Sequence, residues 1–119
     1  MNILLVENKN NIEDLTATVN NAVEDANTYP VTSAADAVET ADRIKIDVAF
    51  LIIRDDWKEN VFFAAEFAEK YPRTNIILCA PSGEYALNAW NINSSRYILN
   101  PVTEEKVRSA MSNLRYGVK

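Results

Sequence analysis

The chain has 119 residues, of which 48% are hydrophobic and 24% are charged, a size that accommodates one domain around one core. Its net charge is −5 and its basic residues are scattered, which disfavours binding to nucleic acid through this domain. The chain has no histidine and a single cysteine, which excludes the usual zinc sites. It has only two glycines, which excludes the phosphate-binding loop and the dinucleotide-binding glycine motif.

Hydropathy gives no sign of a membrane segment. No apolar run approaches the ~18 residues that a membrane-spanning helix needs. The apolar opening is followed at once by Glu7 and Asn8, so it does not predict a secretory signal. Cys79 lies inside an apolar run and cannot pair within the chain, which suits a buried side chain in a reducing compartment. We therefore expect one cytoplasmic domain over residues 1–119.

Five apolar runs predict strands, at residues 2–6, 28–32, 47–53, 75–80 and 96–99. Near-continuous apolar character without polar alternation is typical of strands that are covered on both faces, as in a parallel sheet. The second run is the weakest. Its Pro30 favours an edge position, because proline has no N–H to donate to a neighbouring strand.

Apolar residues at helical spacing follow each predicted strand. These stripes lie within residues 12–23, 34–41, 61–68, 86–90 and 107–114. Thr103 is expected to cap the last helix, with Glu104 and Glu105 in the first turn, where the helix dipole favours acidic side chains. Five successive β-α units predict a doubly wound α/β domain with a five-stranded parallel sheet, right-handed crossovers and the flavodoxin-like strand order 2-1-3-4-5.

In a sheet of this kind, ligands bind at the carboxyl ends of the strands. Stretches at these ends resemble the receiver domain of bacterial two-component response regulators, which has the CheY-like (βα)5 fold. The stretches are ILLVENK, DVAFLIIRDD, NIILCAPSGEYALNAW and YILNPVTEEKV, and the resemblance covers nearly the whole chain. The sequence around LNPVT, with LRYGVK after the last helix, looks most like that of receivers that precede a DNA-binding output domain.

The resemblance implies a role for five positions. In the family, an aspartate at the end of the third strand accepts a phosphoryl group, and the matching residue here is Ile52, which cannot. The family's acidic pair, which holds Mg²⁺, is matched here by Glu7 and Asn8. The hydroxyl that contacts the phosphoryl group is matched by Ala80, and the lysine before a proline is matched by Asn100. We therefore expect a receiver that is not phosphorylated, with no metal, no cofactor and no enzymatic activity, and a vestigial pocket sealed by packing.

Alternatives stay open for the cleft that these five positions would line. Asp55 or Asp56, with Glu7 and Mg²⁺, could retain aspartyl phosphorylation, although acidic residues in a turn also favour the start of the following helix. Ser82 could supply the lost hydroxyl, or cap the helix that follows it. The emptied cleft could instead hold a small apolar or neutral molecule and act as a sensor, which needs on the order of 300 Å³.

The resemblance also points to an interaction surface. Family receivers commonly pair through the fourth helix, fifth strand and fifth helix, and the candidate interface residues here are Trp90, Arg96, Tyr97, Arg108 and Met111. We expect a homodimer through this surface, a sensor kinase or an output domain as further partners, and no contact with a membrane. The alternative is a monomer with Trp90 in the core. Tyr97 matches the family's switch tyrosine and is expected to keep one resting position.

Overall fold

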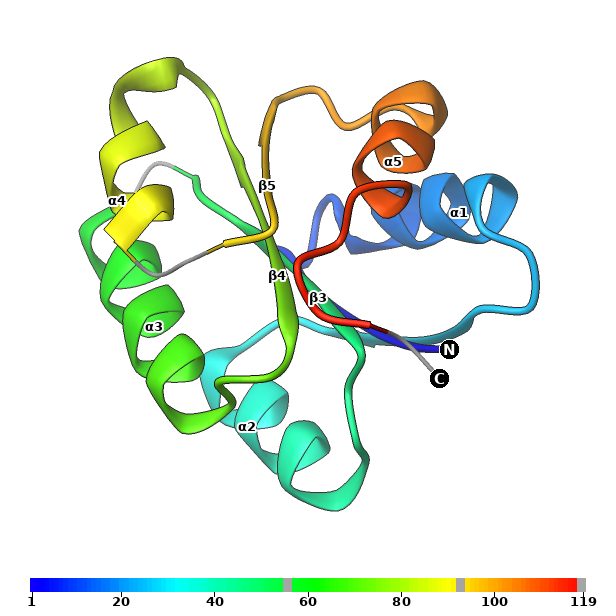
Figure 1. The fold of residues 1–119 in the computed structure, drawn as a ribbon, viewed down its shortest axis with the longest axis horizontal. Coiled ribbons are helices and arrows are strands. Elements are labelled where there is room, and N and C mark those ends of the chain that lie inside the picture. Colours follow the sequence, from blue (N-terminus) through cyan, green and yellow to red (C-terminus); the bar gives the residue numbers. More distant parts are fainter. Residues whose placement is uncertain (55–56, 92–93, 118–119) are drawn as a thin grey trace.

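The computed structural model describes residues 1–54, 57–91 and 94–117, and it consists of a parallel sheet between two layers of helices (Figure 1). The strands are β1 (Asn2–Val6), β2 (Asn27–Val31), β3 (Val48–Ile52), β4 (Asn75–Ala80) and β5 (Arg96–Leu99). Neighbouring strands are parallel and follow the order β2-β1-β3-β4-β5, which confirms the predicted topology. β2, the strand that contains Pro30, lies at an edge as predicted. β2 begins one residue earlier than predicted, and β3 is shorter at both ends.

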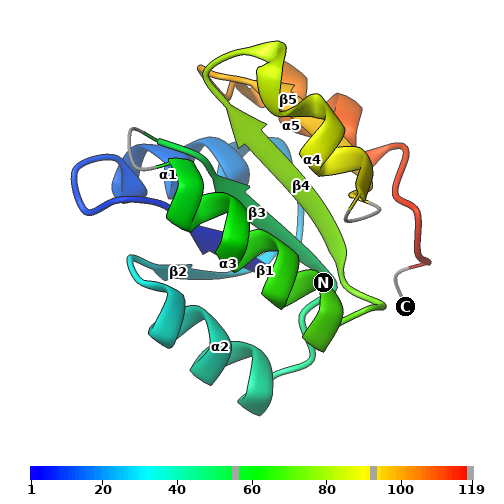
Figure 2. The ribbon, with the colours of Figure 1, turned by 90° about the vertical axis from the view of Figure 1, so that its left-hand side faces the viewer.

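The helices are α1 (Ile12–Ala22), α2 (Ala34–Arg43), α3 (Trp57–Lys70), α4 (Ala86–Asn91) and α5 (Glu104–Met111), and a 3₁₀ turn at Gly83–Tyr85 precedes α4. Helices α1 and α5 cover one face of the sheet (Figure 1), and α2, α3 and α4 cover the other (Figure 2). Within the described ranges, none of these helices has the length and apolar character needed to cross a membrane.

Hydroxyl side chains begin two helical segments as predicted. Thr103 Oγ1 accepts a hydrogen bond from the Lys106 N–H at 3.2 Å at the start of α5, and acidic residues occupy the first turn. Ser82 Oγ accepts a hydrogen bond from the Glu84 N–H at 3.4 Å ahead of the 3₁₀ turn. These caps satisfy backbone donors that have no partner inside the helix, so they fix where the loops after β4 and β5 end.

Strand residues alternate between two cores, because successive side chains of a strand point to opposite faces of the sheet. The core beneath α1 and α5 includes Ile3, Phe50, Ile52, Cys79 and Ile98. The core beneath α2 and α3 includes Leu4, Leu51, Ile53, Leu78 and Ala80. Every residue of β3 and β4 is buried, and burying one large apolar side chain stabilises a fold by about 1.5–3 kcal/mol. The two central strands therefore hold the candidate site on a rigid base.

At the amino end of the sheet, the amide of Asn75 holds the segment after α5 against β4. Asn75 is 1% exposed, and its Nδ2 donates to the carbonyls of Asp47 and Tyr116 at 3.1 and 2.9 Å. Its Oδ1 accepts from the Tyr116 N–H at 2.7 Å and from the Ser95 hydroxyl at 2.8 Å. Ser95 Oγ also accepts from the Arg115 N–H at 3.1 Å. All four hydrogen-bonding positions of the Asn75 amide are thus used inside the chain.

Candidate functional site

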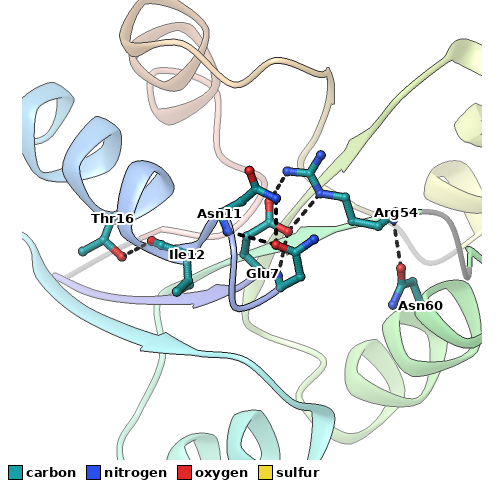
Figure 3. A network of polar contacts seen from close by, with 7 residues as sticks. Glu7, Asn11, Ile12, Thr16, Arg54 and Asn60 are labelled. Carbon is teal, nitrogen blue, oxygen red and sulfur yellow. Dashed lines mark hydrogen bonds and ion pairs between the residues drawn. The ribbon is translucent and has the colours of Figure 1, made fainter.

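The centre of the predicted cleft is an ion pair between Glu7, which follows β1, and Arg54, which lies just beyond β3 (Figure 3). Arg54 Nη2 lies 2.6 Å from Glu7 Oε2, and Arg54 Nε lies 3.0 Å from Glu7 Oε1. The guanidinium therefore holds the carboxylate with two parallel hydrogen bonds. The Glu7 side chain is 3% exposed and that of Arg54 is 38% exposed. A carboxylate so far removed from water needs a compensating charge, and Arg54 provides it.

Backbone and amide groups position both members of the pair. Glu7 Oε1 also accepts the Asn8 N–H at 2.7 Å, and the Arg54 N–H donates to Asn60 Oδ1 at 2.9 Å on α3. Asn8 Oδ1 accepts from the backbone N–H and the side-chain amide of Asn11, at 3.0 and 2.7 Å. The Asn8 side chain is thus used in the turn before α1. These bonds tie the loops after β1 and β3 to the helices that follow them.

The third strand ends in an apolar side chain. Ile52, which the sequence resemblance matches to the family's phosphoacceptor, is 6% exposed and packs in the core beneath α1 and α5. Its register partner on β4 is Cys79, which is buried in the same core. Burial raises the pKa of the Cys79 thiol, and the nearby Glu7 carboxylate raises this pKa further, so the thiol is protonated at neutral pH. Neither residue offers a nucleophile to the cleft.

Ala80 and Asn100 lie side by side at the ends of β4 and β5. The Asn100 N–H donates to the Ala80 carbonyl at 2.8 Å, and the Asn100 residue lines a cavity with Glu7 and Arg54. Ala80 instead is buried in the core beneath α2 and α3 and lines neither of the cavities beside the ion pair. The structure therefore gathers the other predicted pocket residues around Arg54 and places Ala80 outside this group.

Two cavities flank the ion pair between Glu7 and Arg54, and both residues line both cavities. The larger has a volume of 440 Å³ and extends to α1 and to the loop after β5. The smaller has a volume of 320 Å³ and extends to Asn8, Ile52 and the start of α2. The prediction that packing seals the cleft is therefore wrong. Ile52 fills the core side, and among the described residues Arg54 lies between the two cavities and lines both of them.

Arg54 is a site residue that was not predicted from the sequence. It follows the apolar end of β3, at the edge of the sheet where ligands bind, and its charge is opposite to that of the retained Glu7. That charge relation was the available signal. The alternative phosphoacceptors Asp55 and Asp56 lie outside the described residues. Among the side chains that the structure describes, no three histidine, cysteine or acidic side chains gather into a metal site.

The candidate interface residues differ in exposure. Trp90 is 76% exposed, so the alternative that places it in the core is wrong. Arg96 and Arg108 are exposed, and Arg108 Nη1 lies 3.5 Å from Glu104 Oε1 within α5. Met111 is half-buried and packs against the core beneath α1 and α5. Met111 thus contributes mainly to packing inside the domain.

Tyr97 is anchored to the loop that leads into α4. Its side chain is half-buried, and its hydroxyl donates to the carbonyl of Ser82. Burial raises the pKa of the Tyr97 hydroxyl, so the donated proton stays on the oxygen at neutral pH. This bond joins β5 to the loop after β4; that the ring keeps one resting position remains a prediction.

Strand order, helix placement and a cleft at the carboxyl ends of β1 and β3 together define the CheY-like receiver fold. A CheY-like response regulator receiver domain protein from Methanospirillum hungatei superposes with a TM-score of 0.77 at 18% identity, over 93% of this chain and 90% of that one. The response regulatory domain of mrkE from Klebsiella pneumoniae gives a TM-score of 0.72 at 20% identity, over 94% and 93% of the two chains. No family model matches the chain.

A curated bacterial regulator is also similar in sequence. The positive alginate biosynthesis regulatory protein of Pseudomonas aeruginosa is 28% identical over 76 residues, which make up 64% of this chain and 31% of that protein. This chain therefore matches less than a third of the length of that regulator. At these identities the similarities establish the receiver fold, and the role of the cleft depends on its own residues.

Proposed function

We propose that this chain is a response regulator receiver domain that acts without phosphorylation, as a regulatory protein-interaction module. The observation that carries the proposal is the pairing of Glu7 with Arg54 beside a strand that ends in Ile52. An alkyl side chain cannot attack a phosphoryl donor. Three of about four acceptor positions of the Glu7 carboxylate are already used, and a guanidinium in contact with it repels Mg²⁺.

A receiver without this chemistry acts by presenting a surface. Its partners would then be a sensor kinase, an output domain or a second copy, in the cytoplasm where two-component signalling takes place. Nucleic-acid binding would belong to an output domain, because this chain carries a net charge of −5.

Acetyl phosphate with Mg²⁺ tests the absence of phosphorylation. We expect intact-mass spectrometry to show no acid-labile gain of one phosphoryl group, with a phosphorylatable receiver as the positive control. A gain that disappears in the Asp55→Asn, Asp56→Asn double variant would replace the proposal by the alternative of residual aspartyl phosphorylation. A gain that persists in this variant would refute the proposal and show an acceptor elsewhere.

We further propose that two copies pair through α4, β5 and α5. Leu87 and Trp90 lie three residues apart on α4 and are 70% and 76% exposed, and Leu99 on β5 is 47% exposed. Large apolar side chains that gather on a surface are typical of protein interfaces. Glu105 and Arg108 on α5 add charges of both signs, which a two-fold axis can bring opposite each other.

Sedimentation velocity tests this pairing. We expect a dimer that Trp90→Glu converts to a monomer. Phe62→Glu is the matched control, because Phe62 is an aromatic residue of α3 that is also 71% exposed but lies outside the proposed surface. A monomeric wild-type chain, or equal loss of the dimer in both variants, would contradict the pairing.

A small-molecule sensor is the second candidate function. It is favoured by the two cavities beside the ion pair, whose volumes of 440 and 320 Å³ reach the range of small-molecule sites, about 300–1,000 Å³. In this role a ligand in the cleft would take the place of the phosphoryl group as the signal.

A further inference from the structure

The larger cavity of the cleft has charges of both signs on its walls. Among the residues that the structure describes, the acidic ones of its lining are Glu7 and Asp14 and the basic one is Arg54. Neutral hydrogen-bonding groups of the described lining come from Asn11, Thr18 and Asn100. The apolar part of the wall comes from Leu15 and Val102 and from two prolines. At 440 Å³, the cavity has room for a ligand of the size of a free amino acid.

We propose that this cavity binds a zwitterionic small molecule of the α-amino acid class. The inference rests on the proposed function in one respect, namely that no phosphoryl group occupies the cleft. It gives the second candidate function a ligand class.

The charge pattern disfavours ligands that carry charge of one sign. An anion that approaches Arg54 also meets the carboxylates of Glu7 and Asp14, and a divalent cation that approaches the carboxylates meets Arg54. A zwitterion can direct its carboxylate to Arg54 and its ammonium group to Asp14 and Glu7. Each charge then faces its opposite, and the charge-assisted hydrogen bonds of both ends are made together.

The protein groups can accept such a ligand without losing their own contact. Glu7 Oε2 takes part in one hydrogen bond and Oε1 in two, so one acceptor position of the carboxylate remains. The Arg54 side chain is 38% exposed, so a ligand in the cavity can reach part of its guanidinium. Asp14 forms no ion pair with any side chain that the structure describes.

Thermal melting with a panel of common L-amino acids tests the ligand class. At about 10 mM ligand, we expect at least one amino acid to raise the Tm by about 3 °C or more. Its N-acetyl derivative lacks the ammonium charge and its amide lacks the carboxylate, and both derivatives should give no rise. The absence of any shift across the panel, or an equal shift with both derivatives, would overturn the proposal.

Two neighbouring acidic residues of α1 provide a matched pair of variants. Asp14→Asn removes a charge that lines the cavity, whereas Glu13→Gln removes one from the same turn that does not line it. We expect calorimetry to show about tenfold weaker binding of the amino acid to Asp14→Asn, the loss of about one charged contact, with the Tm of the ligand-free variant unchanged. Glu13→Gln should bind as the wild type does. Equal affinities in the two variants would contradict the proposed placement of the ammonium group.

The two proposals fail separately. Phosphorylation of the chain in acetyl phosphate would refute the proposed function, whatever the outcome of the amino acid panel. Absence of both phosphorylation and amino acid binding would refute the ligand proposal alone.

Discussion

The two ends of the sheet bury a polar group in different ways. At the amino end, the neutral amide of Asn75 is 1% exposed and makes four hydrogen bonds inside the chain. At the carboxyl end, the carboxylate of Glu7 is almost as deeply buried and depends on the half-exposed guanidinium of Arg54 and one backbone N–H. Cavities of 440 and 320 Å³ lie beside this second group.

We take this difference to distinguish a structural end of the sheet from the end that we propose to be functional. An amide whose hydrogen-bonding positions are all used fixes the strands and has no capacity left for a ligand. A buried ion pair contributes little net stability, because desolvation offsets the attraction between its charges. A charge pair with open space on both sides is therefore weak as a stabilising device, and this favours a role in binding.

Asn75→Ala should have the largest effect on stability. It removes the partner of several part-buried groups, namely the Ser95 hydroxyl as a donor and both backbone groups of Tyr116, and a lost partner costs up to about 1–3 kcal/mol for each group. We expect the free energy of unfolding in urea to fall by about 3 kcal/mol, against less than about 0.5 for the exposed Asn113→Ala. A loss below about 1 kcal/mol would remove the distinction between the two ends.

Arg54→Met should have the next largest effect, because it leaves Glu7 buried without its cation. Breaking a buried pair costs about 3–5 kcal/mol, and the partial exposure of Arg54 reduces this to about 2. The double variant Glu7→Gln, Arg54→Met should be more stable than Arg54→Met alone. Urea unfolding of the single and double variants measures this, and an additive loss would show that the two residues do not act as a pair.

Tyr97→Phe should cost about 1 kcal/mol, the value of one partly buried hydrogen bond, here to the Ser82 carbonyl. Burial raises the pKa of Tyr97, so its contribution is present below the pKa of the unfolded chain and is lost as the pH rises through the folded value. The difference between wild type and variant should therefore shrink at strongly alkaline pH. Tyr29→Phe, which removes a hydroxyl from another half-buried ring, is the control; an equal loss would make the Ser82 bond irrelevant.

The smallest effect on stability is expected at the exposed contacts of Asp42 on α2 with Lys70 and Tyr71 at the end of α3. The hydroxyl of Tyr71 and the ammonium of Lys70 hold the pKa of Asp42 below its usual value. A lowered pKa stabilises the fold above the unfolded value and is lost as the pH falls through the folded one. Asp42→Asn should therefore leave the melting temperature at pH 7 nearly unchanged. Near pH 3 the difference in melting temperature between the variant and the wild type should be smaller still. A large loss at pH 7 would show that exposed charges also stabilise the amino end.

Most of the fold could be predicted because β3 is apolar along its whole length and β4 is apolar after Asn75, a pattern typical of strands in a sheet that is covered on both faces. The face of a single residue at a strand end was harder to predict. A shift of one position moves a side chain to the opposite face of the sheet, and the register pairs Ile52 with Cys79, while Ala80 faces the other core.

The state of the cleft could not be predicted for a different reason. Arg54 reaches Glu7 across 47 residues of sequence, and the direction of a long flexible side chain leaves no periodic pattern. The resemblance matches Ile52 and Asn100 to phosphorylation groups that they cannot replace, and on this basis we predicted closure by packing. Instead, one guanidinium crosses the cleft, because the retained carboxylate still requires a positive charge.

The central claim is that Arg54 rather than Mg²⁺ is the counter-ion of Glu7 and that the cleft has no phosphoryl site. Thermal melting of the wild-type chain with Mg²⁺ and beryllofluoride, a phosphoryl mimic, tests this claim most directly. The account predicts the same Tm with and without these ions. A saturable rise of about 3 °C or more that requires both ions would contradict it, because only binding to the folded state produces such a shift.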